Sequence, residues 1–551
     1  MNRLSRILLI CLFLTPVLNI AQEFTTAQWQ ADLTFLQKTI HEEYPFLFKK
    51  TTPEAFDTAV AELQRSIPQM ESHEVMVGMA RLVASFGYGH TVLGYWENKV
   101  PLHELPVVLY HFDDGIYLQG VHRDYENLVG SRLVAIEGVP VEEVLKLMRP
   151  VVPAENEMFV KAYGIHYLLF PEFLHAQGVI PALKMDIELT LEKEGELTHE
   201  TLKAVPSERP NRQYGMVIPG EEWVPSRDQS ETPLYLKNLD RIYHFEYLPE
   251  QKTVYVRQSQ IQDEKDEDIP TFYAKVFDFI ADNPVEKFIL DVRLNGGGNN
   301  YKNKPIVKGV IRTEKIDKPG KFIVIIGRRT FSACQNLVNE LSNYTNAVFI
   351  GEPTAENINF YGDNRPVSLP NTGINAYISF AWWQDKPQWE NGPWLAPHLA
   401  TGMTFDQYRS NQDPALEAAL QFSDSTFILD PMEHLTQLFT SGKVEAVKTE
   451  AARMIKDPNY KFFDFESVLD KTGTKLLKSN QLQEALFIYS MISEFFPDSP
   501  WIWIRYGETH QKLGDLQKAS RAYQKAVALD PSGEAGMEAA KRLANMEKQP
   551  E

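Results

Sequence analysis

Cysteine is scarce in this chain of 551 residues, which contains only Cys11 and Cys334. Cys11 lies in an N-terminal segment that we expect to be removed, so one cysteine would remain and no internal disulfide could form. We expect Cys334 to be a small buried residue of a helix. A nucleophilic thiol is the alternative, but no neighbouring sequence feature would activate it.

Positively charged residues are also fewer than negatively charged ones. The chain has 55 Lys and Arg residues against 74 Asp and Glu residues, which gives a formal net charge of −19. Nucleic acids and anionic membrane surfaces are bound by basic patches. The negative net charge therefore disfavours nucleic acids and anionic membranes as partners. It gives no information about the fold.

Long apolar runs are absent beyond the N-terminus. There, Arg3 and Arg6 precede the apolar run 7–18, and cleavage is predicted after Ala21. An uncleaved anchor is the alternative, which the shortness of the run disfavours. We expect residues 1–21 to be the signal peptide of an exported protein, periplasmic or extracellular, with no integral membrane span after cleavage.

Several domains are predicted after this segment, because a chain of this length exceeds one core. Apolar residues at helical spacing come first, and alternating strand patterns follow. A stretch rich in Pro, Arg and Gly then precedes alternating strands and helices. The predicted parts are an N-terminal helical domain at 22–100, a β domain at 101–205, a linker at 206–235, an α/β core at 236–425, a helical linker at 426–465 and helical repeats at 466–551.

The core is predicted from strands that alternate with helices along the chain. Such alternation is typical of a largely parallel sheet covered by helices. The predicted elements are strands at Val254–Val256, Phe288–Val292, Phe322–Ile326 and Val348–Ile350, and helices at Ile269–Asp282 and Cys334–Asn343.

The C-terminal region contains a sequence repeat. Three residues recur 34 positions later, namely Ala485 as Ala519, Tyr489 as Tyr523 and Pro497 as Pro531. This period, with small residues at helix contacts, is typical of tetratricopeptide (TPR) repeats. So few repeats rarely stand alone. We therefore expect them to dock on the preceding helices, and either to bind a protein partner or to brace the rest of the chain.

Ser332 stands between the predicted strand Phe322–Ile326 and the helix that begins at Cys334. At the start of a helix, backbone N–H groups lack intrahelical partners and the helix dipole favours negative charge. Such a place suits an attacking serine oxygen and a developing oxyanion. The alternative is that Ser332 is an ordinary helix N-cap.

Two further motifs accompany Ser332. A strand runs into three glycines within Leu290–Gly298, and Gly351–Thr354 directly follows another strand. Glycine lets the backbone approach a ligand closely and direct N–H groups toward it. A phosphate-binding loop is the alternative for the first motif, but no Gly-Lys-Ser/Thr follows it.

In this order, the motifs Asp291–Gly298, Thr330–Ala333 and Gly351–Thr354 resemble those of the S41 serine peptidases, the family of tail-specific or C-terminal processing proteases. The resemblance covers about residues 25–422. It implies a multidomain α/β protein with an N-terminal helical region, a PDZ-like β domain and an S41 (ClpP/crotonase-like) core, here followed by α-helical TPR repeats. It also implies that Ser332 is the nucleophile and that the N–H groups of Gly297 and Ala333 form the oxyanion hole.

The catalytic base differs between branches of this family. Processing proteases typically have a Lys where this chain has Asn357, and an amide cannot accept the proton. The chain resembles instead the tricorn core protease branch, whose His before the PDZ-like domain corresponds to His90. An imidazole with a pKa near 6.5 suits this role. Gly89 and Tyr88 depart from that branch, and His398, which replaces the Asp of the family's closing Pro-Asp, is the alternative base.

Glu390 corresponds to the acidic residue that completes the site in this family, where it would orient the base or bind a second hydroxyl. The alternative is a solvated glutamate in a loop. We expect neither a cofactor nor a metal, because His41–Glu43 and His73–Glu74 lack the second His of a zinc-protease helix.

The sequence therefore predicts an exported serine endopeptidase that cleaves proteins or peptides through a serine activated by His rather than Lys. The alternative is a catalytically inactive S41-fold protein that binds a ligand or a protein and carries a TPR interaction module, since a fold alone does not give activity. The PDZ-like segment would either capture a substrate C-terminus by strand addition or act as a lid.

Overall fold

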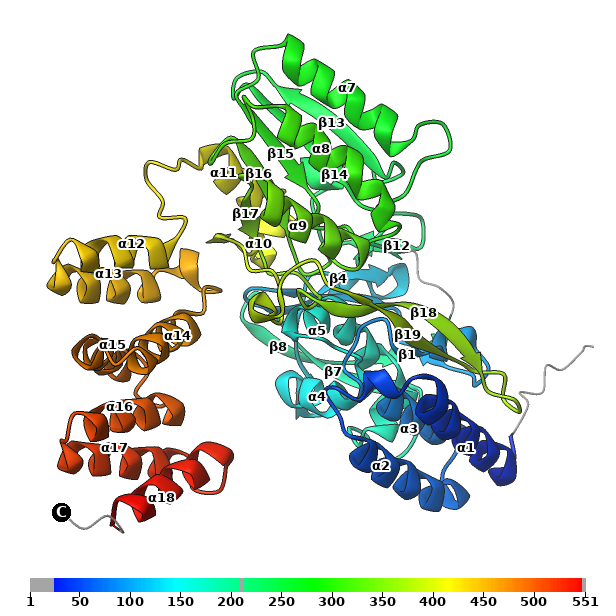
Figure 1. The fold of residues 1–551 in the computed structure, drawn as a ribbon. Helices are drawn as coiled ribbons and strands as arrows, with labels where there is room; N and C mark the ends of the chain where they lie inside the picture. Colours follow the sequence, from blue (N-terminus) through cyan, green and yellow to red (C-terminus); the bar gives the residue numbers. More distant parts are fainter. Residues whose placement is uncertain (1–23, 208–211, 548–551) are drawn as a thin grey trace, which may run out of the picture. The chain divides into compact units, whose positions relative to one another are not determined.

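The structure is a computed structural model that describes residues 24–207 and 212–547. The predicted signal peptide lies outside the described residues. The chain forms two compact units. The first contains the residues up to Arg227 together with Asn359–Gln384, and the second contains Asp228–Ile358 together with the residues from Asp385 onward. Figure 1 labels many of the helices and strands of both.

The first unit opens with three helices, α1 (Thr26–Glu43), α2 (Pro53–Ser66) and α3 (Ser72–Ala84). Thr25 and Thr52 begin α1 and α2, because their hydroxyls accept hydrogen bonds from the N–H groups of Gln28 and Ala55. The apolar side of α1 is buried. The predicted N-terminal helical region is therefore present.

An antiparallel sheet follows in the first unit, with strand order β12-β4-β5-β7-β8, β3 beside β4 and β6 beside β5. Its strands are β3 (Val107–Phe112), β4 (Gly115–His122), β5 (Arg132–Ile136), β6 (Val139–Pro140), β7 (Asp186–Lys193), β8 (Glu196–Lys203) and β12 (Trp223–Pro225). Helices α4 (Val141–Met148), α5 (Glu157–Tyr163) and α6 (Pro171–Ala176) lie between β6 and β7 along the chain.

The segment predicted to be a linker, 206–235, contributes strands to this unit. β12 pairs with β4, and the short strands β10 (Arg212–Gln213) and β11 (Met216–Val217) pair with each other. The two residues between β10 and β11, Tyr214 and Gly215, both have positive φ, as a tight hairpin turn requires. The Pro and Gly residues that suggested a linker mark tight turns between short strands instead.

A long hairpin forms a second sheet in the first unit. β18 (Phe360–Ser368) pairs with β19 (Asn375–Trp383), and β19 pairs with β1 (Val92–Leu93). These strands were predicted to be part of a continuous core at 236–425. The predicted core is therefore interrupted by residues 359–384, because β19 pairs with β1, which comes much earlier in the chain.

The second unit is built around a six-stranded sheet, order β13-β14-β15-β16-β17-β20, parallel except for the first pair. Its strands are β13 (Tyr243–Leu248), β14 (Thr253–Gln258), β15 (Lys287–Asp291), β16 (Phe322–Ile326), β17 (Val348–Gly351) and β20 (Leu399–Ala400). The predicted α/β core with a largely parallel sheet is confirmed.

Helices cover both faces of this sheet. Alternate strand residues such as Leu290 and Val324 pack with α7 (Ile269–Asp282), α8 (Lys304–Arg312) and α9 (Ala333–Tyr344). Their neighbours, such as Ile289 and Ile323, pack with α11 (Pro414–Gln421), which follows α10 (Phe405–Arg409). Burial on both faces explains why these strands are continuously apolar in sequence.

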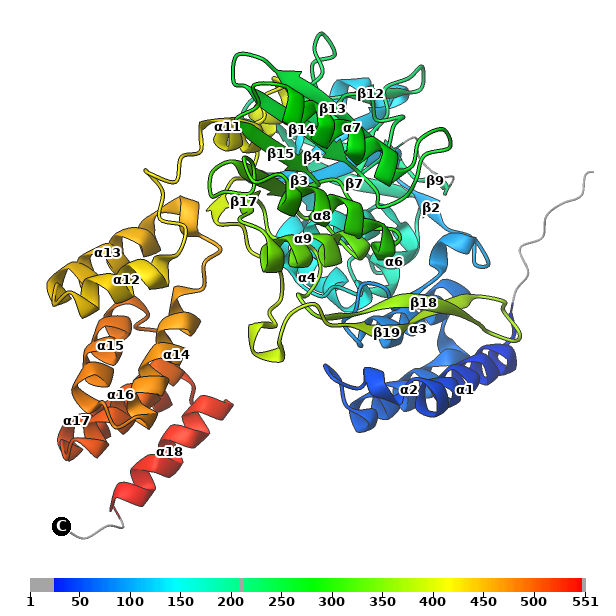
Figure 2. The ribbon, with the colours of Figure 1, turned by 45° about the horizontal axis from the view of Figure 1, so that its top comes forward.

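The rest of the second unit is helical. Figures 1 and 2 show helices stacked in chain order: α12 (Pro431–Thr440), α13 (Val444–Lys456), α14 (Phe465–Lys478), α15 (Leu482–Phe495), α16 (Pro500–Lys512), α17 (Leu516–Leu529) and α18 (Glu534–Glu547). A Cβ added to Gly473 or Gly507 would lie 2.7 Å from the ring of Tyr489 or Tyr523, respectively. The repeating tyrosines thus pack directly on glycines of the preceding helix.

Within residues 24–207 and 212–547, the chain forms no helix that is both long and apolar enough to cross a membrane.

Candidate active site

Ser332 has an unusual backbone conformation. It directly precedes α9, yet its φ of 56° and ψ of −127° are not those of a normal N-cap, and its side chain makes no capping hydrogen bond. A positive φ is uncommon for a residue other than glycine and costs about 1–3 kcal/mol when the surrounding structure enforces it. The structure therefore argues against the ordinary N-cap interpretation and indicates a strained turn.

The turn before Ser332 is fixed from two directions. The Thr330 hydroxyl donates to the carbonyl of Val292 at 3.0 Å and accepts the Gly327 N–H at 3.1 Å. The N–H of Phe331 donates to the carbonyl of Asn295 at 3.1 Å. The end of β15 thus holds the turn that carries Ser332, which explains why these two motifs occur together.

Gly297 lies directly against Ser332. A Cβ added to Gly297 would be 2.6 Å from the Cβ of Ser332 and 2.9 Å from the backbone nitrogen of Ala333. Three predicted site residues, Ser332, Ala333 and Gly297, are therefore brought together. The φ of Gly297 is +102°, so this position also needs glycine for its backbone conformation.

The two predicted oxyanion donors differ in their surroundings. Ala333 is the first residue of α9, and the helix itself offers no acceptor for its N–H. The N–H of Gly297 instead donates to Oδ1 of the buried Asn295 at 2.9 Å. A role of Gly297 in binding an oxyanion therefore requires this bond to be exchanged, and Ala333 is the donor that the observed geometry favours.

Glu356 is a site residue that sequence reasoning missed. Its side chain is fully buried (0% exposed), and its Oε2 accepts the N–H of Ser332 at 2.5 Å. The signal available in the sequence was its place, two residues after the Gly351–Thr354 motif and directly before Asn357, the position of the family's Lys.

Cys334 fits its predicted structural role. It is fully buried in α9, and burial raises the pKa of its thiol well above the usual range. A thiol that resists ionisation is a poor nucleophile. The nucleophilic alternative is therefore disfavoured.

His90 belongs to the first unit, so its pairing with Ser332 stays a prediction from the sequence. Its ring stacks on Phe360 with centroids 6.1 Å apart, and its carbonyl accepts a hydrogen bond from Asn364 at 2.9 Å. Burial lowers the pKa of His90, while the carboxylates of Glu155 and Asp363 oppose this shift. A lowered pKa keeps the imidazole neutral near pH 7, the form that accepts a proton.

His398 has surroundings that argue against its use as a base. Its Nδ1 accepts the N–H of Phe349 at 2.9 Å, so the remaining proton of the neutral ring is on Nε2. Neither nitrogen can then take up a proton without the loss of this bond. Burial lowers the pKa of His398 to about 4, which agrees with a structural role at the junction of β17 and β20.

This environment predicts an acid sensitivity. An unfolded His has a pKa near 6.5, so the unfolded state binds the proton first and the free energy of unfolding falls as pH drops from about 6.5 to about 4. His398→Asn keeps an oxygen that can accept the Phe349 N–H but does not titrate. Its unfolding free energy, measured by urea denaturation between pH 4 and pH 7, should fall less steeply than that of the wild type. Equal slopes would contradict this. His244, whose pKa burial also lowers to about 4, contributes to both proteins.

Glu390 has the surroundings of a solvated residue. It ends a short 3-10 helix at Gln388–Glu390, is exposed, and lies 3.8 Å from the Nζ of Lys386. This geometry favours the alternative of a loop glutamate in the observed conformation. Its role in a proton relay stays a prediction.

Other charged residues of the motifs serve the structure. Arg293 pairs with Asp291 at 2.8 Å and with Asp413 at 2.7 Å, all three buried or nearly so. Arg328 forms a two-bond pair with Glu352 at 2.7 and 2.5 Å. These pairs fix the ends of β15, β16 and β17 next to the turn that carries Ser332.

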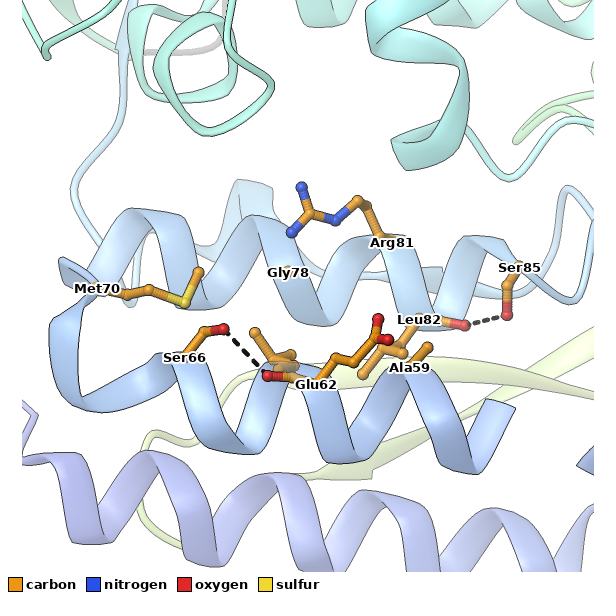
Figure 3. A pocket seen from close by; sticks show the side chains of 9 residues that line it. Ala59, Glu62, Ser66, Met70, Gly78, Arg81, Leu82 and Ser85 are labelled. Atoms are coloured by element: carbon orange, nitrogen blue, oxygen red, sulfur yellow. Dashed lines mark hydrogen bonds between the residues drawn. The ribbon is translucent and has the colours of Figure 1, made fainter. Parts of the chain in front are cut away.

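The first unit also contains a cavity of about 370 Å³ between α2 and α3, which Figure 3 shows from close by. Three of its polar side chains make hydrogen bonds: Ser66 donates to the carbonyl of Glu62, Ser85 to that of Leu82, and Arg81 to the side chain of Gln177. No predicted site residue lines it. We assign no function to this cavity.

Comparisons with known proteins agree with the prediction of TPR repeats. The family described as Tetratricopeptide repeat matches residues 500–532, which span α16 and α17. The predicted repeat is therefore confirmed in its second copy. No curated protein matches the chain.

Several solved structures are similar to this chain. A structure of mature CPAF complexed with lactacystin is 13% identical, covering 70% of this chain and 95% of that chain with a TM-score of 0.45. The photosystem II D1 C-terminal processing protease is 11% identical, with coverage of 73% and 99% and a TM-score of 0.34. A structure from Bacteroides fragilis described as that of an S41 protease is 14% identical, with coverage of 62% and 88% and a TM-score of 0.25. The family that the sequence motifs resemble is thus also represented among the similar structures.

Proposed function

We propose that this protein is an exported serine peptidase that cleaves proteins or peptides by acyl transfer. The observation that carries the proposal is the conformation of Ser332, held at positive φ in a turn directly before α9. A strained serine at the start of a helix, beside a glycine-rich loop, is suited to present its oxygen to a carbonyl carbon. Export is inferred from the N-terminal sequence alone.

The proposed chemistry proceeds in two steps. The Oγ of Ser332 attacks the scissile carbonyl carbon while His90 takes its proton, and the bond to the amine breaks as His90 returns the proton to the leaving nitrogen. Water then hydrolyses the acyl-enzyme by the same route. The N–H of Ala333 would stabilise the oxyanion, an interaction usually worth about 3 kcal/mol. We propose Gly297 as a second donor and Glu390 as the residue that orients the base.

The test is labelling of the mature protein by a fluorophosphonate probe, which reacts with activated serines. The wild type is expected to be labelled, and Ser332→Ala to lose labelling because the attacking oxygen is absent. His90→Ala is expected to lower the labelling rate by about 10²–10⁴-fold, the usual contribution of a general base. His398→Asn, which keeps an acceptor for the Phe349 N–H, serves as the matched control and should react within a few-fold of the wild type.

Two results would contradict the proposal. Labelling that persists in Ser332→Ala would show that the probe reacts elsewhere. A wild type without labelling, and with the same thermal unfolding as Ser332→Ala, would support the alternative of an inactive S41-fold binding protein. The observations that favour this alternative are the hydrogen bond from Gly297 to Asn295, the exposure of Glu390 and the absence of a Lys at position 357.

A further inference from the structure

We infer that Glu356 is a positioning residue, whose carboxylate holds Ser332 in its reactive conformation by accepting the Ser332 N–H. The catalytic part of this inference rests on the proposed function, whereas the structural part does not. Glu356 makes its bond to the backbone of the nucleophile, so it acts through Ser332 and not on the substrate.

The conformation of Ser332 determines where its N–H finds an acceptor. An ordinary N-cap residue has an extended backbone, and its side-chain oxygen accepts a hydrogen bond from an N–H group in the first turn of the helix. At a φ of 56°, the N–H of Ser332 turns to a different side, where Oε2 of Glu356 lies 2.5 Å away. In the strained conformation the Ser332 N–H therefore has an acceptor outside the helix, and the bond to Glu356 stabilises that conformation.

Glu356 is itself held firmly by hydrogen bonds of the segment 354–356. The N–H of Ala355 donates to the carbonyl of Thr330 at 3.1 Å. The Thr354 hydroxyl donates to the carbonyl of Glu356 at 3.3 Å and accepts the N–H of Leu395 at 3.0 Å. The segment 354–356 is therefore tied both to the turn before Ser332 and to the chain that leads into β20.

Burial adds to the importance of this bond. A buried polar group is costly unless it is hydrogen-bonded, and the Ser332 N–H supplies a donor to Oε2 of the buried Glu356. This arrangement also occupies the N–H of Ser332 and leaves the N–H of Ala333 as the first donor of the helix.

The test compares Glu356→Ala, Glu356→Gln and Glu356→Asp by the rate of fluorophosphonate labelling and by hydrogen exchange of the peptide 328–336. Glu356→Ala should lower the labelling rate about 100-fold, the effect of a displacement of about 1 Å, and should speed exchange of the Ser332 amide. Glu356→Gln keeps an oxygen acceptor and should react within about ten-fold of the wild type. Glu340→Ala, which removes a half-buried carboxylate from α9, the helix that follows Ser332, is the matched control.

The outcomes separate this inference from the proposed function. If the wild type is not labelled but exchange of the Ser332 amide still depends on Glu356, the proposed function fails and the positioning role stands. If Glu356→Ala is labelled like the wild type and its Ser332 amide exchanges at the same rate, the inference is overturned. Should Glu356→Ala not fold, Glu356→Asp decides, because its shorter side chain withdraws the acceptor. Unchanged labelling and exchange in that variant would also overturn the inference.

Discussion

Replacement of Gly297 by alanine is expected to lower the labelling rate of Ser332 at least about 100-fold. The new Cβ would lie 2.6 Å from the Cβ of Ser332 and 2.8 Å from the carbonyl oxygen of Phe331. These atoms belong to the proposed nucleophile and to the backbone before it, which cannot move aside as a flexible side chain can, and an L-residue also resists a φ of +102°. The turn must therefore shift, and a shift of about 1 Å in a reacting group costs about 10²-fold in rate.

Gly296 offers a matched control for this prediction. A Cβ added there meets no atom within 4 Å, and its φ is not in the left-handed region. Gly296→Ala should therefore be labelled within a few-fold of the wild type, and the two variants are compared at a temperature at which both are folded. Equal labelling of Gly297→Ala and Gly296→Ala would show that the contact between Gly297 and Ser332 does not support the reactive conformation.

The α/β core could be predicted because its signals are local. The boundaries of α7 and β16 were predicted to the residue, since each combines a clear apolar pattern with a cap, Pro or Gly at its end. Strand–helix alternation then implied a parallel sheet, whose strands are apolar on both faces. Ser332 was found for the same reason, because a strand, a small turn and a helix adjoin in sequence.

The parts that were missed depend on contacts between distant segments. The partner of β19 is β1, about 280 residues earlier in the chain, and no local pattern in either strand identifies the other. Glu356 was passed over because its role depends on the direction of a backbone N–H in a turn 24 residues before it. The φ of Ser332 sets that direction, and residue types alone do not reveal it.

Replacement of Asp32 by alanine is expected to destabilise the first unit by at least about 3 kcal/mol. The carboxylate of Asp32, in α1, is fully buried (0% exposed) and accepts four hydrogen bonds at 2.7 to 2.9 Å. The donors are the backbone and side chains of Asn371 and Thr372, in the turn between β18 and β19. Alanine would leave these donors without their acceptor, and each buried unsatisfied donor costs about 1–3 kcal/mol. Urea denaturation followed by circular dichroism measures the loss.

Two further variants test whether the loss of stability comes from the hydrogen bonds that Asp32 accepts. Asp32→Asn has almost the same size but places an NH₂ group against donors, so it should also be destabilising, because the site needs acceptors on both oxygens. Glu42→Ala, on the same helix, removes an exposed carboxylate whose ion pair with Lys38 spans 3.9 Å. It should change the free energy of unfolding by less than about 0.5 kcal/mol. Equal stability of Asp32→Ala and Glu42→Ala would refute the anchoring role of Asp32.

The anchor matters beyond stability because of what else the hairpin carries. β18 begins at Phe360, whose ring stacks on His90, and its Asn364 donates to the carbonyl of His90 at 2.9 Å. Asp32 fixes the far end of the same hairpin, so its loss would loosen the strand that packs on the proposed base. Asp32→Ala should therefore speed hydrogen exchange at residues 88–91 at urea concentrations below the unfolding transition. Unchanged exchange there, with the expected loss of stability, would confine the role of Asp32 to the hairpin turn.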